Sequence, residues 1–159
     1  MDYLWTPWRY RYIASAKTDD HCVFCEAIAA NDDRQTLVLL RGEKNFIILN
    51  RYPYTSGHVM VVPYSHVADL SSADPDMLAE MMQLAQRMQL ALQKTYRPEG
   101  FNIGMNLGRA AGAGIVGHLH LHVLPRWAGD ANFMTVVGET RVEPEELSTT
   151  YDRLHSALS

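Results

Sequence analysis

The apolar residues of this chain recur with two periods, one typical of β-strands and one typical of α-helices. The first two strand-like runs flank Gly42 and a short polar stretch, which predicts a hairpin whose turn is longer than two residues. We expect a further short edge strand near the C-terminal end, at residues 134–137. The five main runs, rich in β-branched and other apolar residues, predict strands at residues 37–41, 46–49, 58–62, 101–107 and 119–124.

The longest helical pattern begins at Asp74 and Pro75, a capping residue followed by proline at the first helical position. Apolar residues then recur every three or four positions until Pro98 stops the pattern, which predicts a helix to about Tyr96. Its methionine-rich stripe is typical of a helix packed on a sheet. The stripe consists of Met77, Met81, Leu84, Met88 and Leu92.

Length and composition place these elements in one domain. The chain has 159 residues, of which 47% are hydrophobic and 20% are charged, as in a soluble protein with a sizeable core. Hairpin-linked strands and one long helix predict an α+β fold, with an antiparallel sheet of about five strands packed on one long and one or two short helices. We divide this single domain, 1–159, into an N-terminal arm at 1–16, a core at 20–138 and a C-terminal helix at 143–158; a short helix is also expected at 24–30.

Charge and cysteine content exclude several classes of protein. A net charge of −4 argues against broad binding to nucleic acids or membrane surfaces. No apolar run approaches the roughly 20 residues that span a bilayer, and the N-terminus lacks the pattern of a secretion signal. Two cysteines do not form a disulfide framework. We therefore expect a cytoplasmic protein.

The N-terminal arm alternates aromatic residues with Arg9 and Arg11. Such a segment could stack on a nucleotide and neutralise it. We favour the simpler interpretation, in which the arm packs on the body of the protein or on a second subunit.

Three histidines at alternate positions, His118, His120 and His122, carry the strongest chemical signal. In an extended strand they share one face, opposite Leu119 and its apolar neighbours. At about 3.3 Å per residue the outer two lie about 13 Å apart, so one metal ion cannot easily bind all three. Two neighbours could form half of a zinc site. Alternatively, one imidazole attacks phosphorus through one ring nitrogen while a carbonyl keeps the other protonated.

Two further motifs bear on this row. Residues 108–117 contain four glycines, whose backbone N–H groups could surround phosphate oxygens beside a nucleophile. Cys22 and Cys25 have the spacing of a metal knuckle, which is half a site; two buried, inert thiols are the alternative.

Residues 118–124 match the signature of the histidine triad (HIT) superfamily, in which three histidines alternate with apolar residues. Residues 49–63 and 125–130 resemble its fragile-histidine-triad branch. Together with residues 4–9 and 130–134, they make the chain look most like bacterial HIT proteins related to diadenosine tetraphosphate phosphorylases. The resemblance implies a HIT-like fold. It also implies a homodimer joined through the long helix and the fourth-strand region.

The resemblance also implies roles for individual residues. His120 would be the nucleophile that forms a covalent nucleotidyl-histidine, and His122 would contact the phosphates. Many family members carry Gly-Gln-Ser or Gly-Gln-Thr before the triad, whereas residues 113–116 read Ala-Gly-Ile-Val, so backbone amides would have to serve. The implied nucleotide wall comprises Asn50, His58, Asn106, Gly112 and Gly114.

In the zinc-bearing branch of the family, a histidine after the third strand and the first triad histidine complete the cysteine pair. Those positions are His66 and His118 here. The resemblance therefore implies a closed structural zinc site of Cys22, Cys25, His66 and His118.

These expectations lead to a nucleotide-cleaving enzyme that acts on dinucleoside polyphosphates, with phosphate favoured over water as the second acceptor. A hydrolase of nucleoside phosphoramidates or adenylates is an alternative, and so is a nucleotide-binding sensor without activity. A zinc hydrolase that uses His118 and His120 as ligands is a further alternative.

Overall fold

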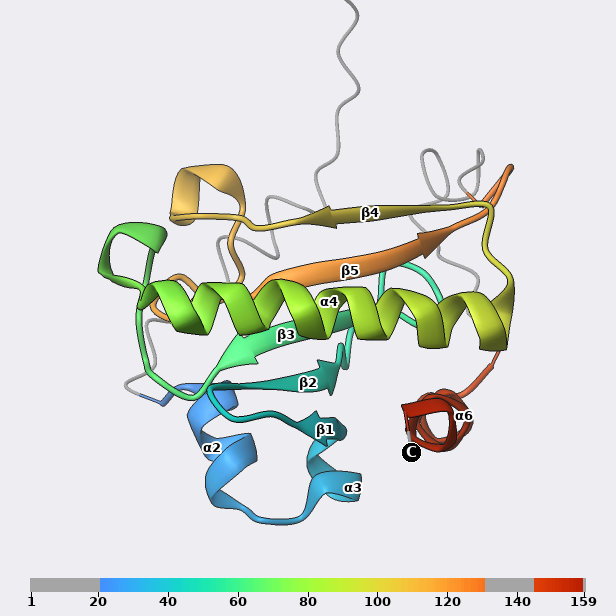
Figure 1. Ribbon diagram of the computed structural model, residues 1–159, viewed down its shortest axis with the longest axis horizontal. Coiled ribbons are helices and arrows are strands. Elements are labelled where there is room, and N and C mark those ends of the chain that lie inside the picture. Colours follow the sequence, from blue (N-terminus) through green and yellow to red (C-terminus); the bar gives the residue numbers. More distant parts are fainter. Residues whose placement is uncertain (1–20, 131–144, 159) are drawn as a thin grey trace, which may run out of the picture.

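The computed structural model describes residues 21–130 and 145–158 (Figure 1). The N-terminal arm and the edge strand expected at residues 134–137 lie outside the described residues. In chain order the elements are α2 (Val23–Ala29), α3 (Asp33–Thr36), β1 (Val38–Arg41), β2 (Asn45–Leu49), β3 (Val59–Pro63), η1 (Leu70–Ser72), α4 (Pro75–Tyr96), β4 (Gly100–Gly104), η2 (Arg109–Ala111), β5 (Leu121–Arg126) and α6 (Leu147–Leu158).

The five strands form one antiparallel sheet in the order β1-β2-β3-β5-β4. The last strand in sequence is thus inserted between β3 and β4. As a result, the segment before β5 lies beside the end of β3, although it is far away in sequence. The predicted α+β class and the predicted antiparallel sheet are confirmed.

Both faces of the sheet are covered, because alternate side chains of a strand point to opposite faces. On one face, Ile47 and Leu49 of β2 belong to a cluster that packs against α4 and α6. On the other face, Phe46 and Ile48 pack in a second cluster with Phe24 of α2. Figure 1 shows α4 crossing the sheet, with α6 beside it near β1. The sheet is therefore the middle layer, and each face can position a different group of residues.

Helix α4 confirms the prediction from its caps and its period. The Asp74 side chain accepts a hydrogen bond from the N–H of Asp76, and Pro75 is the first helical residue. At the other end, Arg97 adopts the left-handed conformation that closes the helix. The predicted apolar stripe is buried throughout its length.

Several predicted boundaries were wrong, and the sheet explains two of them. Strand β5 begins at Leu121 rather than at 119, because the Leu119 N–H leaves the ladder and donates to the carbonyl of Val67 (2.6 Å). Strand β4 ends at Gly104, whose pairing partner His122 is the second residue of β5, so from Asn106 onwards the chain has no residue of β5 opposite it. The C-terminal helix begins at Leu147, and the short helix α3 was not predicted.

Within the described ranges, 21–130 and 145–158, no helix is both long and apolar enough to cross a membrane.

Candidate active site and metal centre

The three alternating histidines lie at the junction where β5 enters the sheet. Only His122 is in the strand, opposite Met60 of β3, whereas His118 and His120 precede it. All three are buried, at 1%, 5% and 8% exposure respectively. The rings of His120 and His122 are 4.9 Å apart between centroids. The histidines therefore form one compact group, although the extended strand expected for them holds only the last.

The protonation of His120 follows from one hydrogen bond. Its Nδ1 atom lies 2.8 Å from the carbonyl oxygen of His118, and a carbonyl only accepts hydrogen bonds. Nδ1 must therefore carry the proton, which leaves a lone pair on Nε2. Burial lowers the pKa of His120, so the ring is neutral at pH 7. A neutral imidazole with a free Nε2 lone pair is the form that attacks phosphorus.

His122 has the opposite tautomer, because a chain of hydrogen bonds sets it. The N–H of Tyr54 donates to Nδ1 of His58 (3.1 Å), so the proton of neutral His58 lies on Nε2. That Nε2 donates to Nδ1 of His122 (2.9 Å). The remaining proton of neutral His122 is therefore on Nε2. Burial, reinforced by the nearby His120, lowers the pKa of His122 to about 4. His122 is thus a neutral donor beside the neutral ring of His120.

Asn50 and His58 are joined to this pair. The Asn50 amide nitrogen lies 3.3 Å from Nδ1 and 3.4 Å from Nε2 of His58, and its oxygen accepts from the N–H of Tyr52 (2.9 Å). His58 is fully buried. The ring of Tyr54 lies 4.7 Å from that of His58 and 6.1 Å from that of His122, nearly parallel to the latter. Sequence reasoning missed Tyr54, since an isolated tyrosine in a loop carries no recognisable signal.

The glycine-rich loop lies between β4 and the histidines. Gly112 has a φ of +84°, in the left-handed region that favours glycine, and its N–H donates to the carbonyl of Arg109 (3.0 Å). Gly114 is exposed, and Asn106 is half-buried where the chain leaves β4. The described hydrogen bonds link Asn50, His58 and His122 directly. The loop residues occupy a separate segment leading to them.

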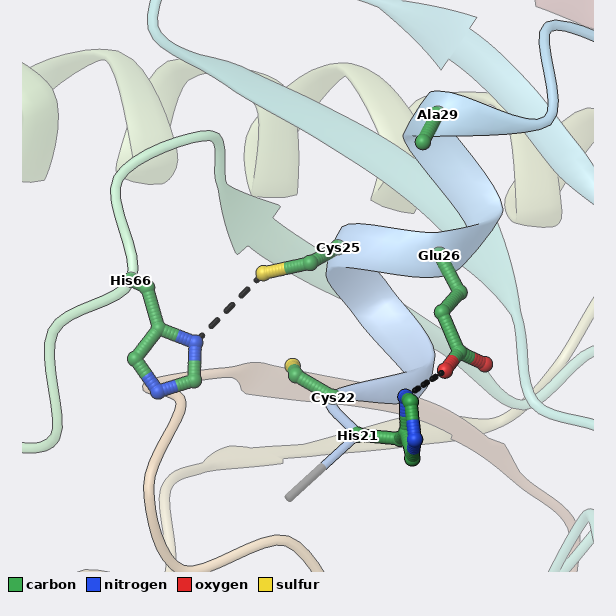
Figure 2. Close-up of a pocket in the computed structure, with 6 residues that line it drawn as sticks. All are labelled: His21, Cys22, Cys25, Glu26, Ala29 and His66. Atoms are coloured by element: carbon green, nitrogen blue, oxygen red, sulfur yellow. Dashed lines mark hydrogen bonds and ion pairs between the residues drawn. The ribbon is translucent and has the colours of Figure 1, made fainter.

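The four predicted metal ligands come together from three segments of the chain. Cys22 and Cys25 lie at the start of α2, and His66 follows β3 (Figure 2). His118 precedes β5. Sγ of Cys22 is 3.2 Å from Nδ1 of His118, and Sγ of Cys25 is 3.4 Å from Nδ1 of His66. All four ligand atoms lie within 4.8 Å of one another.

Three of the sulfur–nitrogen separations, 3.2, 3.4 and 3.7 Å, are close to those of a tetrahedral zinc site. With Zn–S near 2.3 Å and Zn–N near 2.0–2.1 Å, neighbouring ligand atoms in such a site are about 3.3–3.8 Å apart. The widest separation, within 4.8 Å, would have to shorten when an ion binds. His118 offers Nδ1 to the site while its Nε2 donates to the carbonyl of Pro63 (2.9 Å). Metal-binding histidines typically donate their other ring N–H to a carbonyl or carboxylate in this way. His21 is turned toward Glu26 (3.2 Å), as Figure 2 shows. The donor set is therefore two thiols and two imidazoles.

Comparison with known proteins agrees with this arrangement. The HIT domain family matches residues 31–129. An "AP-4-A phosphorylase" of Mycobacterium tuberculosis is 42% identical over 154 residues, which cover 92% of this chain and 79% of the relative. A Zn-bound histidine triad family protein from Mycobacterium smegmatis has a TM-score of 0.70 and 32% identity, covering 86% of this chain and 92% of its own. A hypothetical histidine triad nucleotide-binding protein from Sulfolobus tokodaii has a TM-score of 0.69 and 28% identity, covering 86% and 91% respectively. The chain belongs to the HIT domain family.

Proposed function

We propose that this protein cleaves dinucleoside polyphosphates of the diadenosine tetraphosphate type, through a nucleotide covalently bound to His120, and that phosphate then accepts the nucleotide. The observation that carries the proposal is the hydrogen bond from Nδ1 of His120 to the His118 carbonyl, which leaves Nε2 free to attack. The mycobacterial relative named AP-4-A phosphorylase supports the substrate class and the acceptor.

In the first step, the Nε2 lone pair of His120 forms a bond to the α-phosphorus, and the bond from that phosphorus to the bridging oxygen breaks. With diadenosine tetraphosphate this step releases ATP and leaves an adenylyl group on His120. In the second step, an oxygen of inorganic phosphate attacks the same phosphorus, the bond to Nε2 breaks, and ADP leaves. The lone pair returns to His120, so the enzyme is regenerated.

His122 supplies a neutral donor to this reaction. Its Nε2 proton can hydrogen-bond a phosphoryl oxygen on which negative charge increases in the transition state. The relay from Tyr54 through His58 keeps that proton in place. We place Asn50 at the ribose, in one wall with His58, and Asn106 with the loop of Gly112 and Gly114 at the phosphates. These placements follow the family resemblance and the glycine-rich loop. Gly114 would offer its amide, whereas the N–H of Gly112 already donates to the Arg109 carbonyl, so Gly112 would shape the turn.

We propose that Cys22, Cys25, His66 and His118 hold a structural zinc ion. Two thiolates and two imidazoles make a closed tetrahedral set, which leaves no position for substrate. When bound, the ion would cross-link α2 to the segment that follows β3 and to the segment that precedes β5. His120 and His122 remain free for nucleotide chemistry.

We also propose a cytoplasmic homodimer with adenine nucleotides as substrates. Strand β4 is at one edge of the sheet, and Ile103 on it is 43% exposed. On α4, the apolar side chains of Met82 and Leu90 are 56% and 61% exposed. A second copy would cover these side chains and the edge of β4 that pairs with no strand in the described part of the chain. Light scattering that finds a monomer at micromolar concentration would contradict the dimer.

The deciding experiment is incubation with diadenosine tetraphosphate, with and without inorganic phosphate, followed by separation of the products. ADP and ATP formed only with phosphate support the proposal. AMP and ATP formed at the same rate without phosphate would show that water is the acceptor. The control is His155→Ala, which removes an exposed histidine of α6, well outside the triad, and is expected to keep the activity. If His120→Ala retains turnover, the nucleophile is wrong.

A further inference from the structure

Phe24 connects the metal site to the nucleophile. It lies between Cys22 and Cys25 in sequence, and its side chain is only 2% exposed. Its ring centroid is 5.4 Å from that of His118, with the planes at 79°, and 5.3 Å from that of His120, with the planes at 54°. These values lie in the range of packed aromatic pairs. One side chain of the metal-binding turn therefore touches both a metal ligand and the proposed nucleophile.

The position of Phe24 depends on few anchors. Helix α2 has seven residues, too few to be stable alone, and its N-cap residue Cys22 makes no capping hydrogen bond through its side chain. The buried residues of α2 are Phe24 and Ala27. The helix is therefore held by the packing of these two residues and of the half-buried Ile28 in the second apolar cluster, and by the thiol contacts at its start. A metal ion at Cys22 and Cys25 would fix the end of α2 that carries Phe24.

His120 needs such support, because rotation about the last side-chain bond of histidine has broad minima. The Nδ1 hydrogen bond holds one edge of the ring. Contacts with Phe24 and His122 limit how far the ring can tilt. A tilt would move Nε2 away from the line of attack, and errors of about 1 Å in such alignment can cost about 100-fold in rate.

We infer that Phe24 is a positioning residue, through which the metal-binding turn holds the imidazole of His120 in its reactive orientation. The inference rests on the proposed function for its effect on rate and on the proposed zinc site for its link to metal. The structural part, that Phe24 immobilises the His120 ring, stands apart from both.

The test compares Phe24→Leu with Phe46→Leu. Phe46 is fully buried in the same apolar cluster, and its ring contacts Tyr64 (5.5 Å), so its replacement removes the same volume away from the histidines. Single-turnover rates of nucleotidyl-enzyme formation and nucleotide Kd are measured for both. We expect Phe24→Leu to slow formation at least about tenfold with Kd unchanged within about twofold, while Phe46→Leu stays within about twofold of the wild-type rate. Equal slowing in both variants, or a rise in Kd alone for Phe24→Leu, would overturn the inference.

A second readout does not need activity. Exchange of the His120 Nδ1 proton with water, followed by NMR, reports how firmly the ring is held. Phe24→Leu is expected to speed this exchange about tenfold, and removal of zinc from the wild-type protein is expected to act in the same direction. If the wild type forms no covalent nucleotide, exchange still decides the role of Phe24, and unchanged exchange refutes it. If the wild-type protein contains no zinc, the proposed link between the metal site and His120 is refuted, whereas the contact of Phe24 with His120 is not. If the thermal midpoint of Phe24→Leu shows that it is unfolded, Phe24→Met replaces it, because the unbranched methionine side chain adapts better to an irregular site.

Discussion

Lowering the pH should destabilise the folded protein in part because His122 resists protonation. Its pKa is about 4 in the folded state, compared with an ordinary value of 6.5. Above pH 6.5 the ring is neutral in both states, so its contribution to stability is fully present there. Between pH 6.5 and 4 the unfolded chain binds a proton that the folded chain does not, and stability falls as the pH falls. Below pH 4 both states are protonated and the loss is complete.

The magnitude follows from the size of the shift. At about 1.36 kcal/mol per pKa unit, lowering the pKa of His122 from 6.5 to about 4 costs about 3.4 kcal/mol of stability over the whole pH range. Between pH 7.5 and 5.0 the loss is about 2 kcal/mol. His122 is 8% exposed, so solvent screening reduces this value little. The cost comes mainly from burial, and His120 adds to it.

The assay is urea unfolding at pH 7.5 and 5.0, for the wild type and for His122→Gln. The variant has no imidazole at this position but keeps the other titratable groups, including the metal-site residues. Their acid sensitivity therefore cancels in the comparison. We expect the wild type to lose about 2 kcal/mol more than the variant over this interval. If both lose the same amount, His122 titrates normally and the burial argument fails.

Three further predictions follow from the site. His120→Ala should abolish turnover but keep nucleotide binding measurable by equilibrium dialysis, because the nucleophile is lost while the wall remains; residual turnover above about one part in a thousand would contradict this. Protein purified without chelators should contain one zinc per chain by elemental analysis, and brief chelation should leave most of the initial activity, because the closed site has no catalytic position; immediate and complete loss would favour a catalytic metal. Tyr54→Ala should raise the pKa of His122 toward 6.5 in NMR titrations, because the substitution exposes the His122 ring to water. Tyr54→Phe should keep the pKa of His122 low, and Tyr52→Ala should leave it unchanged. Equal pKa values in Tyr54→Ala and Tyr54→Phe would show that the Tyr54 ring does not shield His122.

Local patterns predicted the elements whose causes are local. Helix α4 was predicted because its capping residue, its first-turn proline and its apolar period all lie within one segment. The antiparallel sheet was predicted for the same reason, since each strand has its own apolar run. Strand ends were less predictable. The start of β5 depends on the hydrogen bond between Leu119 and Val67, which only the folded chain creates.

The group of two cysteines and two histidines shows how much of a site a sequence motif can predict. Spacing alone identified Cys22 and Cys25 as half a site, and the family resemblance supplied His66 and His118. The structure brings the four ligand atoms within 4.8 Å, from segments up to 96 residues apart. It also supplies the Pro63 carbonyl, a backbone group that no sequence motif can identify.

By itself, then, the sequence determined which residue types are present at which spacing, and thereby the fold class, the helix and the identity of the three alternating histidines. The tertiary structure decided what each imidazole can do. Because β5 is inserted next to β3, His122 lies beside His58, which is 64 residues away in sequence. The N–H of Tyr54 fixes the tautomer of His58, and His58 in turn fixes that of His122. His120 instead donates to the His118 carbonyl and keeps Nε2 free. The tautomer of His122 is set by hydrogen bonds from a distant segment, and that of His120 by the turn that precedes β5. Three histidines that look equivalent in the sequence therefore differ in protonation and partners only in the folded chain, which is the basis for the separate roles we propose for them.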